Sequence, residues 1–382
     1  MNGSGIKIRG CKIFYTNANS LFNKVGELIS IVTASNYKIV CITETHLTKH
    51  ICDAEIALPN FTIFRADRSN DSGFGGSAIY VHNSLKVSVL NWFLDTESIA
   101  LEIYFPYSKK MNIACIYRSP NLTDNENNTL LGQLESIPIT ENENTIMVGD
   151  FNLPNVNWKY GIVDAPQNST DKRYILQNKY LDIFTTRGMH WYIREDSTRI
   201  KLVSEKIQKS TLDQIFASNE CIICNVSIMA PIGKSDHLSL DIELQTEMDP
   251  DYVHVKTKDW YKVTESFIIE NSKKINWSYC RDNLSVHDMW DELYSKLMCI
   301  NDAIPNVDLK YTRQGEVIKK LPWDNSKLVR KRKEKDKSWK CFDESPCMVN
   351  FQSALYKQRE FERVEYNAKV MYETKIVKKT EI

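Results

Sequence analysis

Hydrophobic and polar residues alternate along the first part of the chain in a way that predicts many short strands and a few helices. Residues 7–15 alternate as in a strand, residues 21–35 carry apolar side chains at helical spacing, and residues 37–42 form a short apolar run. This order is typical of a β-α-β unit. Further strands are predicted at 60–66, 77–81, 86–90, 98–105 and 111–117. Closely spaced strands after such a start indicate an α/β fold with two mixed sheets.

Helices and strands are predicted again from residue 126 to residue 244. Helical spacing covers residues 126–136 and 171–182, and a buried strand at 145–149 lies between them. Residues 191–201 are predicted to form one arm of a hairpin. The last strands are expected at 210–216 and 221–229, and in a segment that ends at Leu244.

The pattern changes beyond Glu247. Residues 247–251 (EMDPD) are a predicted boundary, and helical spacing with few strand signals follows from residue 263, as in 286–298 and 351–376. Residues 327–340 (KLVRKRKEKDKSWK) are densely basic and predict either a solvated helix face or a contact with nucleic acid. We therefore expect one domain at 1–246, a linker at 247–262 and a helical, basic region at 263–382.

Composition and charge fit a globular protein with two units. Apolar residues make up 42% of the 382 residues, charged residues make up 26%, and the formal net charge is zero. Residues 1–250 carry 23 Lys and Arg against 28 Asp and Glu, whereas residues 251–382 carry 26 against 21. No apolar run approaches the roughly 20 residues of a membrane span. The N-terminus lacks a signal-peptide pattern, so we expect a protein that is not secreted and does not contact a membrane.

Polar side chains stand where several predicted strands end. Asp150 and Asn152 follow the strand at 145–149, and Asn17, Glu44 and Tyr117 follow three other strands. Open α/β sheets place ligands at the carboxyl ends of their strands, and carboxylate and amide oxygens suit a magnesium ion. Each of these residues taken alone is equally compatible with a turn or a solvated surface.

A second candidate stretch is Ser235-Asp236-His237, directly before the last predicted strand. A single histidine is more often a packed or surface residue than a catalyst. Asp213 lies among apolar residues of a predicted strand, where an aspartate needs a partner, and it could fix the tautomer of His237. Together with the strand-end residues, this inventory suits metal-assisted phosphodiester hydrolysis. Nucleophilic catalysis by serine or cysteine fits less well, because no elbow motif surrounds a candidate.

The order of these motifs resembles the endonuclease/exonuclease/phosphatase superfamily, and within it the apurinic-like endonuclease domain of non-LTR retrotransposons. The resemblance covers roughly residues 6–246. It is carried by YTNANSL (15–21), CITETHL (41–47), GGSAIYVHNSL (75–85), IYRSPN (116–121), VGDFNLPNVNW (148–158), STLDQIF (210–216) and GKSDHLSL (233–240). The fold that this resemblance implies is a four-layer αββα sandwich of two mixed sheets, followed by a helical C-terminal extension.

The resemblance also implies a function: a Mg²⁺-dependent DNA endonuclease that nicks one strand and leaves a 3′-hydroxyl, as in target-primed retrotransposition. The implied metal ligands are Glu44, Asp236 and Asn17. The implied catalytic residues are Asp150, Asn152, His237, Asp213 and Tyr117, with the general base left open between His237 and Asp150. The expected DNA contacts are Arg118 and the basic loop residues Arg199, Lys201, Lys206 and Lys209.

Cofactor, partners and location follow from the same resemblance. We expect Mg²⁺, with Mn²⁺ as the alternative, a monomer that binds DNA in the nucleus, and element RNA on the basic C-terminal helices. The chain contains no Tyr/Phe-x-Asp-Asp polymerase signature, so we expect an element truncated before its reverse transcriptase. Two other readings stay open: another phosphodiesterase or phosphatase of this fold, and a catalytically inactive nucleic-acid-binding fragment.

Overall fold

The computed structural model describes residues 11–68, 73–105, 110–139, 144–164, 171–246, 256–258, 262–277, 285–308 and 321–380. It divides the chain into two compact units, one made of 1–249 with 319–382 and the other made of 250–318. This division differs from the one expected, because the last helices pack with the N-terminal domain and only the segment between forms a unit of its own. The N-terminal part of the strand expected at 7–15 lies outside the described residues.

The first unit is built around two six-stranded mixed sheets. Sheet 1 has the order β15-β16-β1-β2-β4-β3 and sheet 2 has the order β11-β14-β8-β7-β6-β5. The strands of sheet 1 are β1 (Lys12–Asn17), β2 (Ile39–Thr43), β3 (Phe61–Ala66), β4 (Ser77–His82), β15 (Ile223–Met229) and β16 (Ser239–Leu244). Those of sheet 2 are β5 (Lys86–Leu90), β6 (Ile99–Tyr104), β7 (Lys110–Tyr117), β8 (Asn144–Asp150), β11 (His190–Trp191) and β14 (Asp213–Ala217).

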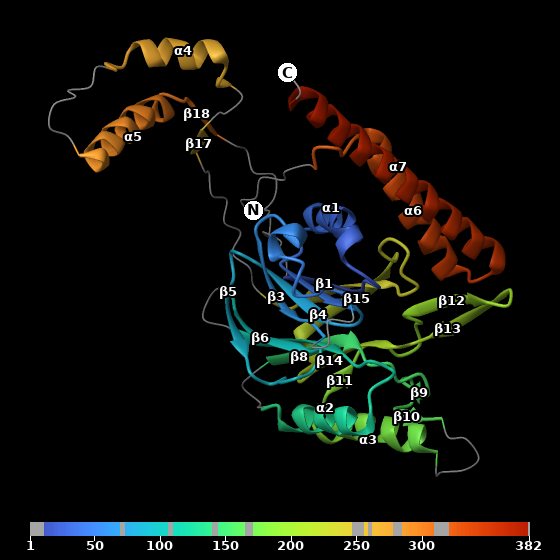
Figure 1. Ribbon diagram of the computed structural model, residues 1–382. Coiled ribbons are helices and arrows are strands. Elements are labelled where there is room, and N and C mark those ends of the chain that lie inside the picture. The colour runs from blue at the N-terminus through green and yellow to red at the C-terminus, as the bar shows by residue number, and fades with distance from the viewer. Residues whose placement is uncertain are drawn as a thin grey trace, which may run out of the picture. The chain divides into compact units, whose positions relative to one another are not determined.

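The two sheets pack face to face between helices (Figure 1). Apolar side chains of both sheets, among them Ile13, Ile113 and Val148, form one buried cluster between them. Helix α1 (Val25–Ser35) covers the outer face of sheet 1, and helices α2 (Asp124–Ser136) and α3 (Lys172–Thr186) cover the outer face of sheet 2. The expected αββα sandwich is therefore confirmed. Shorter elements are η1 (Phe22–Lys24), η2 (Asp53–Ile56), β9 (Val156–Asn157), β10 (Ile162–Val163) and η4 (Glu220–Ile222).

Strand register brings the polar strand ends together. Parallel pairing of β1 with β2 sets Asn17 beside Thr43, the residue before Glu44. Parallel pairing of β7 with β8 sets Tyr117 beside Asp150, and antiparallel pairing of β8 with β14 sets Asp213 beside Asp150. The carboxyl ends of parallel strands lie at one edge of a sheet, so side chains that are far apart in sequence meet there.

A basic hairpin and two long helices complete the first unit. The hairpin consists of β12 (Arg199–Val203) and β13 (Lys206–Ser210), and the helices are α6 (Ser326–Glu344) and α7 (Met348–Thr380). Leu328, Lys335, Trp339 and Phe342 of α6 are buried, so its inner face packs against the rest of the unit. Most other residues of α6 are polar and solvated.

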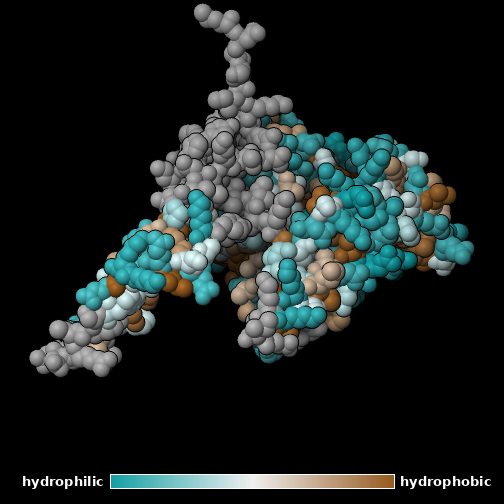
Figure 2. All heavy atoms as spheres, turned by 90° about the horizontal axis from the view of Figure 1, so that it is seen from above, coloured by the Kyte–Doolittle hydropathy of each residue, from teal (hydrophilic) through white to brown (hydrophobic). Residues whose placement is uncertain are grey.

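The second unit contains α4 (Glu265–Lys273), α5 (Val286–Asp302) and a two-stranded ribbon of β17 (Lys256–Lys258) and β18 (Asn306–Asp308). Helix α5 begins with a capping box, in which Ser285 and Asp288 bond each other's backbone N–H groups. Figure 2 shows that the visible surface of the described residues is mainly hydrophilic, with hydrophobic residues in small scattered groups. Within the described residues, no helix has the length and apolar character needed to cross a membrane.

Candidate active site

Two carboxylates and one amide meet at the ends of β1, β2 and β8. The Asn17 side-chain Nδ2 donates to Glu44 Oε1 at 3.0 Å and to Asp150 Oδ2 at 2.9 Å. Asn17 and Asp150 are fully buried, whereas Glu44 is partly open to solvent. Ligand atoms of Glu44, Asp150 and His237 lie within 4.8 Å of one another, the one such group found among the described residues. Oxygen donors this close suit a hard divalent cation.

Two residues of this site adopt left-handed backbone conformations. Glu44 has φ of +48° and Asn152 has φ of +48°. For residues other than glycine this region costs free energy and is enriched at functional sites. The Asn152 backbone N–H donates to Asp150 Oδ1 at 3.0 Å, so the turn after β8 orients the Asp150 carboxylate.

Arg118, expected at the DNA surface, is instead buried beneath the turn after β8. Its Nη1 donates to the backbone oxygen of Asn152 at 3.0 Å and its Nε donates to Asn127 Oδ1 at 3.0 Å. The Asn152 amide returns a hydrogen bond to the backbone oxygen of Arg118, also at 3.0 Å. This guanidinium therefore fastens the 150–152 turn to β7 and α2.

His237 is held by a buried hydrogen-bonded chain. Its Nδ1 donates to Asp213 Oδ2 at 2.7 Å, and the Tyr15 hydroxyl donates to Asp213 Oδ1 at 2.5 Å. Asp213 is completely buried. Since Asp213 engages Nδ1, the ring nitrogen that can act on a substrate is Nε2. Sequence reasoning gave Tyr15 no role, although it lies two residues before Asn17 and so shares its face of β1.

The charges of the site shift its protonation equilibria. Burial, together with the carboxylates of Asp213 and Glu44, raises the pKa of Asp150 to about 8. Burial lowers the pKa of His237, but attraction to Asp213, Asp150 and Asp236 outweighs that effect and raises the pKa to about 9. The two pKa values depend on each other, because an ionised Asp150 favours the proton on His237 and a charged His237 disfavours the proton on Asp150.

At the same site, the carboxyl group of Glu44 is ionised and the phenol of Tyr117 is neutral. Burial opposes ionisation of Glu44, yet its bonds from His46 and Asn17 lower its pKa below the ordinary value, so it is an anion. Burial, with the nearby charges of Glu44 and Asp150, raises the pKa of Tyr117 above its usual range. Its phenol is therefore a neutral hydroxyl that can donate a hydrogen bond. His46, whose Nε2 lies 3.6 Å from Glu44 Oε2, is a further neighbour that sequence reasoning did not assign.

Asp236 and the basic hairpin are joined beside His237. Asp236 Oδ2 pairs with Arg199 Nε at 2.8 Å, and Asp236 does not belong to the group of three potential ligands. The backbone N–H of Ile200 donates to the backbone oxygen of Asp236 at 2.9 Å, and that of Leu238 donates to the backbone oxygen of Thr198 at 2.7 Å. The start of the hairpin therefore pairs, through its backbone, with the segment that carries His237.

The four basic hairpin residues lie in different surroundings. Arg199 is paired with Asp236, and Lys209 Nζ lies 5.2 Å from the ring centroid of Phe342 on α6. Lys201 and Lys206 are exposed to solvent. Lys209 is exposed as well, so all three lysines of the hairpin could reach a phosphate backbone, and Lys201 and Lys206 lie away from the Phe342 ring.

Comparison with known proteins gives a family match for the central segment. Residues 111–241 match the family model described as endonuclease-reverse transcriptase. This match includes nearly all of β7, the strands β8 and β14, and the segment that carries His237, and it confirms the resemblance to an endonuclease domain of the endonuclease/exonuclease/phosphatase superfamily. No curated protein matches the chain.

Solved structures with similar folds include three nucleases. The endonuclease domain of TRAS1, a telomere-specific non-LTR retrotransposon, is 15% identical with a TM-score of 0.47, covering 62% of this chain and 99% of that one. The AP endonuclease LMAP from Leishmania major is 13% identical with a TM-score of 0.49, covering 62% and 88%. An AP endonuclease from Archaeoglobus fulgidus is 15% identical with a TM-score of 0.45, covering 62% and 100%.

Proposed function

We propose that this chain, whose residues 111–241 match the endonuclease-reverse transcriptase family, is a Mg²⁺-dependent endonuclease that nicks one strand of DNA and leaves a 3′-hydroxyl. The observation that carries the proposal is the meeting of Glu44, Asp150 and His237 within 4.8 Å at the ends of three elements. Two carboxylates and a histidine held by a buried aspartate are the groups that metal-assisted phosphodiester hydrolysis requires.

The donor set fits a divalent cation. Glu44 and Asp150 would hold it. Asn17, expected as a ligand, turns its Nδ2 donor to both carboxylates while its Oδ1 accepts from the Asn19 backbone N–H at 3.1 Å, so it would orient the two carboxylates and not bind the cation. Asp150 is a buried carboxylate whose ionisation is opposed by two other acids, so a positive charge at this place would relieve its raised pKa. When bound, the cation supplies positive charge at the scissile phosphate. Asp236, paired with Arg199, would act next to the cation site and not as its first ligand.

The other side chains act on the phosphate and on protons. Asp213 bonds Nδ1 of His237 and favours its protonated form, which would place an Nε2–H donor at the site. The neutral phenol of Tyr117 is suited to donate a hydrogen bond to a phosphate oxygen. Asp150 and Asn152 would position the attacking water and the phosphate. The bond from Asn152 Nδ2 to the backbone oxygen of Arg118 fixes this amide and leaves its second N–H for the phosphate.

The experiment that tests the proposal is plasmid nicking. We expect purified protein to convert supercoiled plasmid to the open circle with Mg²⁺, and EDTA to stop the reaction. Glu44→Gln should lower the rate by about 10²-fold or more, because it removes a cation ligand at unchanged volume. Glu135→Gln, an exposed carboxylate on α2, is the matched control.

Three results separate the alternatives. Nicked circles that prime DNA synthesis carry a 3′-hydroxyl, as proposed. Retardation of plasmid in a gel without any nicking would identify a catalytically inactive nucleic-acid-binding protein. Hydrolysis of small phosphate monoesters or diesters, with plasmid left intact, would identify another phosphatase or phosphodiesterase of this fold.

The exposed hairpin lysines should contribute to DNA affinity and not to chemistry. We expect the double variant Lys201→Ala/Lys206→Ala to raise the dissociation constant for DNA and to reduce the slope of its logarithm against log salt by about 1.8, because each lost phosphate contact contributes about 0.9. The rate at saturating DNA should stay unchanged. Lys86→Ala, exposed on the edge strand β5, is the control, and an equal loss of affinity in that variant would contradict the assignment.

A further inference from the structure

The C-terminal helices α6 and α7 contact the loop that carries His237. We call residues 231–238 the His237 loop. Lys335 Nζ on α6 donates to the backbone oxygen of Pro231 at 3.2 Å, and the Gln358 amide on α7 donates to the backbone oxygen of Gly233. Lys335 and Gln358 are both buried. Side chains from the far end of the chain thus bond backbone groups a few residues before His237.

A buried carboxylate on α1 joins these contacts. Glu27 Oε1 accepts from Lys335 Nζ at 2.5 Å, and Glu27 Oε2 accepts from the Gly233 backbone N–H at 2.8 Å. Glu27 and Lys335 are each about 2% exposed. Removing one partner of a buried ion pair strongly destabilises the folded protein, because the remaining charge is buried without compensation. Gly233 is therefore held on its N–H by Glu27 and on its carbonyl by Gln358.

An apolar cluster holds the other end of the His237 loop. Leu238, directly after His237, and Ile200 of the hairpin are buried in a cluster with Trp339, Phe342, Phe351 and Ala354. Trp339 Nε1 donates to Gln358 Oε1 at 3.0 Å, which links the cluster to the Gly233 contact. The loop is thus held by α6 and α7 at both of its ends.

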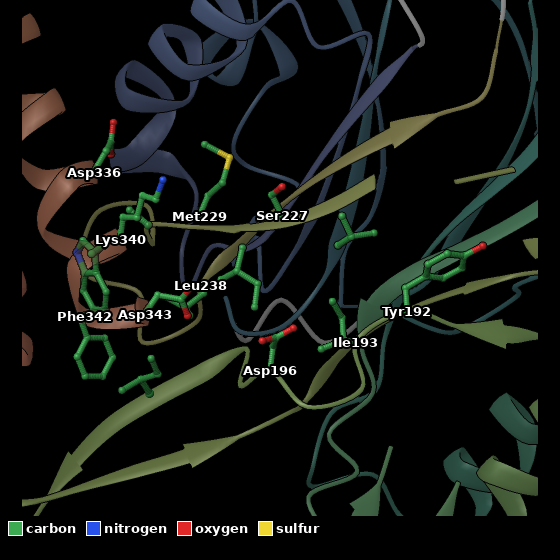
Figure 3. A pocket seen from close by; sticks show the side chains of 15 residues that line it. Tyr192, Ile193, Asp196, Ser227, Met229, Leu238, Asp336, Lys340, Phe342 and Asp343 are labelled. Atoms are coloured by element: carbon green, nitrogen blue, oxygen red, sulfur yellow. The ribbon is translucent and has the colours of Figure 1, made fainter. Parts of the chain in front are cut away.

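The apolar contact leaves part of the space between α6 and the segments around Leu238 and Met229 unfilled. Figure 3 shows Leu238 and side chains of α6 around a cavity of about 580 Å³, whose walls include Ile193, Met229 and Phe342. Apolar contact is lost wherever a void separates two surfaces. The His237 loop is therefore attached to α6 and α7 both by the apolar cluster and by the polar contacts of Lys335 and Gln358.

The inner side of the His237 loop leads directly into the active site. The Ser235 hydroxyl donates to the backbone oxygen of Asn17 at 2.8 Å, and the His237 backbone N–H donates to Ser235 Oγ at 3.2 Å. A shift of Gly233 would therefore be transmitted through Ser235 to both His237 and Asn17. Displacements of about 1 Å at a catalytic group can lower a rate by about 10²-fold.

We propose that α6 and α7 are an integral part of the endonuclease and hold His237 in its working position, with Lys335, Gln358 and Glu27 as positioning residues. This inference rests on the proposed function for its catalytic consequence. The simpler alternative is that the helices only add stability to the unit. The two differ in what happens locally at the His237 loop under conditions in which the protein stays folded.

The test uses three variants of the full chain. Lys335→Met removes the charge and the bond to Pro231, Gln358→Ala removes the bond to Gly233, and Lys337→Met changes an exposed lysine on the same helix as the matched control. In the first two variants we expect amide hydrogen exchange in the His237 loop to rise about tenfold or more, with exchange in β1 and β8 unchanged. We expect kcat for nicking to fall about 10- to 100-fold at unchanged KM, and the control to match the wild type.

A double variant tests whether the bond between Glu27 and Gly233 contributes to the position of the His237 loop. Glu27→Gln combined with Lys335→Met removes both charges of the buried pair, and the introduced amide keeps an oxygen that can accept from the Gly233 N–H. We expect this pair to regain part of the loop protection and part of kcat relative to Lys335→Met alone. A double variant no better than the single one would contradict the role given to the Glu27–Gly233 bond.

The outcomes separate the two proposals. If Lys335→Met and Gln358→Ala lower the melting temperature but leave loop exchange and kcat at wild-type values below that temperature, the positioning role is wrong. If the wild type does not nick DNA, the proposed function fails, and loop exchange in the same variants still decides the positioning role. Should Lys335→Met fail to fold, Gln358→Ala, which buries no unpaired charge, carries the test alone.

Discussion

Replacing Asp150 by asparagine is expected to abolish nicking and at the same time to stabilise the metal-free protein. Asparagine keeps the size of the side chain and an oxygen toward the Asn152 N–H. It gives up the bond that Oδ2 accepts from Asn17, and it removes the negative charge beside the proposed cation. We expect the nicking rate to fall by about 10³-fold, because the charge acts in a buried site where electrostatic effects are largest.

The stabilising effect of Asp150→Asn should depend on pH. Because the pKa of Asp150 is raised from 3.8 to about 8, the folded protein binds the proton more tightly than the unfolded chain does. The stability from this proton is fully present below about pH 4 and is lost as the pH rises through about 8. The variant has no such loss, so its advantage should grow over that window to an order of a few kcal/mol.

Thermal melting at pH 5 and pH 8, with and without Mg²⁺, measures both effects. The variant should melt above the wild type at pH 8 in EDTA, and Mg²⁺ should raise the melting temperature of the wild type alone. Asp164→Asn, an exposed aspartate, controls for a general change of charge. A variant that nicks at the wild-type rate, or that melts below the wild type at pH 8 in EDTA, contradicts the placement of Asp150 at a cation site.

The positions of the strand-end residues could be predicted from the sequence because two rules of strand geometry apply to them. Side chains two residues apart share a face of a strand, and parallel strands end at one edge of a sheet. This explains why Asn17 and Glu44 meet at the edge of sheet 1, whereas Asp150 ends a strand of sheet 2 and reaches Asn17 because the two sheets pack face to face. The same alternation could have pointed to Tyr15, two residues before Asn17, but its partner Asp213 lies 198 residues away and no local pattern identifies it.

Residues whose surroundings depend on distant segments were harder to predict. Asp236 and Arg199 were assigned to the cation and to DNA, and the structure pairs them with each other across 37 residues. Arg118 was assigned to DNA because it follows a strand end, but it is buried by contacts with Asn127 and with the turn after β8. Nothing local in a sequence distinguishes a guanidinium that binds phosphate from one that binds backbone oxygens.

The basic helix shows what a charge count leaves out. Residues 327–340 were expected to present a solvated or nucleic-acid-binding face, yet Lys335 at their centre is buried against Glu27. Leu328, Lys335, Trp339 and Phe342 follow one another at steps of seven, four and three residues, so they occupy one face of α6. That spacing is visible in the sequence. The acidic partner 308 residues away is not, which is why the C-terminal helices were expected to form a separate region.

The residues of the site are thus held in two ways, by the two sheets and by contacts to a loop. Strand register places Asn17 near Glu44 in sheet 1 and Asp150 beside Asp213 in sheet 2, and the face-to-face packing of the two sheets brings these pairs together. His237 lies on a loop, and its geometry depends on side chains from α1, α6 and α7 as well as on Asp213. Loops carry function when a rigid scaffold fixes them, and here part of that scaffold comes from outside the two sheets.

Asp213→Asn should slow nicking by about 10² to 10⁴-fold while the protein keeps its fold, because an amide can accept from only one side and no longer fixes the charge of His237. Asp213 lies fully buried with its two oxygens bonded to Tyr15 and His237. Without its charge, burial dominates at His237 and the pKa of the imidazole should fall from about 9. The limb of the pH–rate profile that His237 controls should therefore move to lower pH in the variant.

The limb of the pH–rate profile that His237 controls moves to lower pH whether His237 acts as an imidazolium or as a neutral base. The two roles differ in which limb moves, the alkaline one or the acidic one. If the imidazolium stabilises charge, activity is lost as the pH rises and the alkaline limb moves down. If neutral His237 is the base, activity is lost as the pH falls and the acidic limb moves down. Tyr15→Phe, which removes one hydrogen bond to Asp213 and keeps its charge, is the matched control and should change the rate by less than about tenfold. A pH profile unmoved in Asp213→Asn would show that the buried pair does not control the reaction.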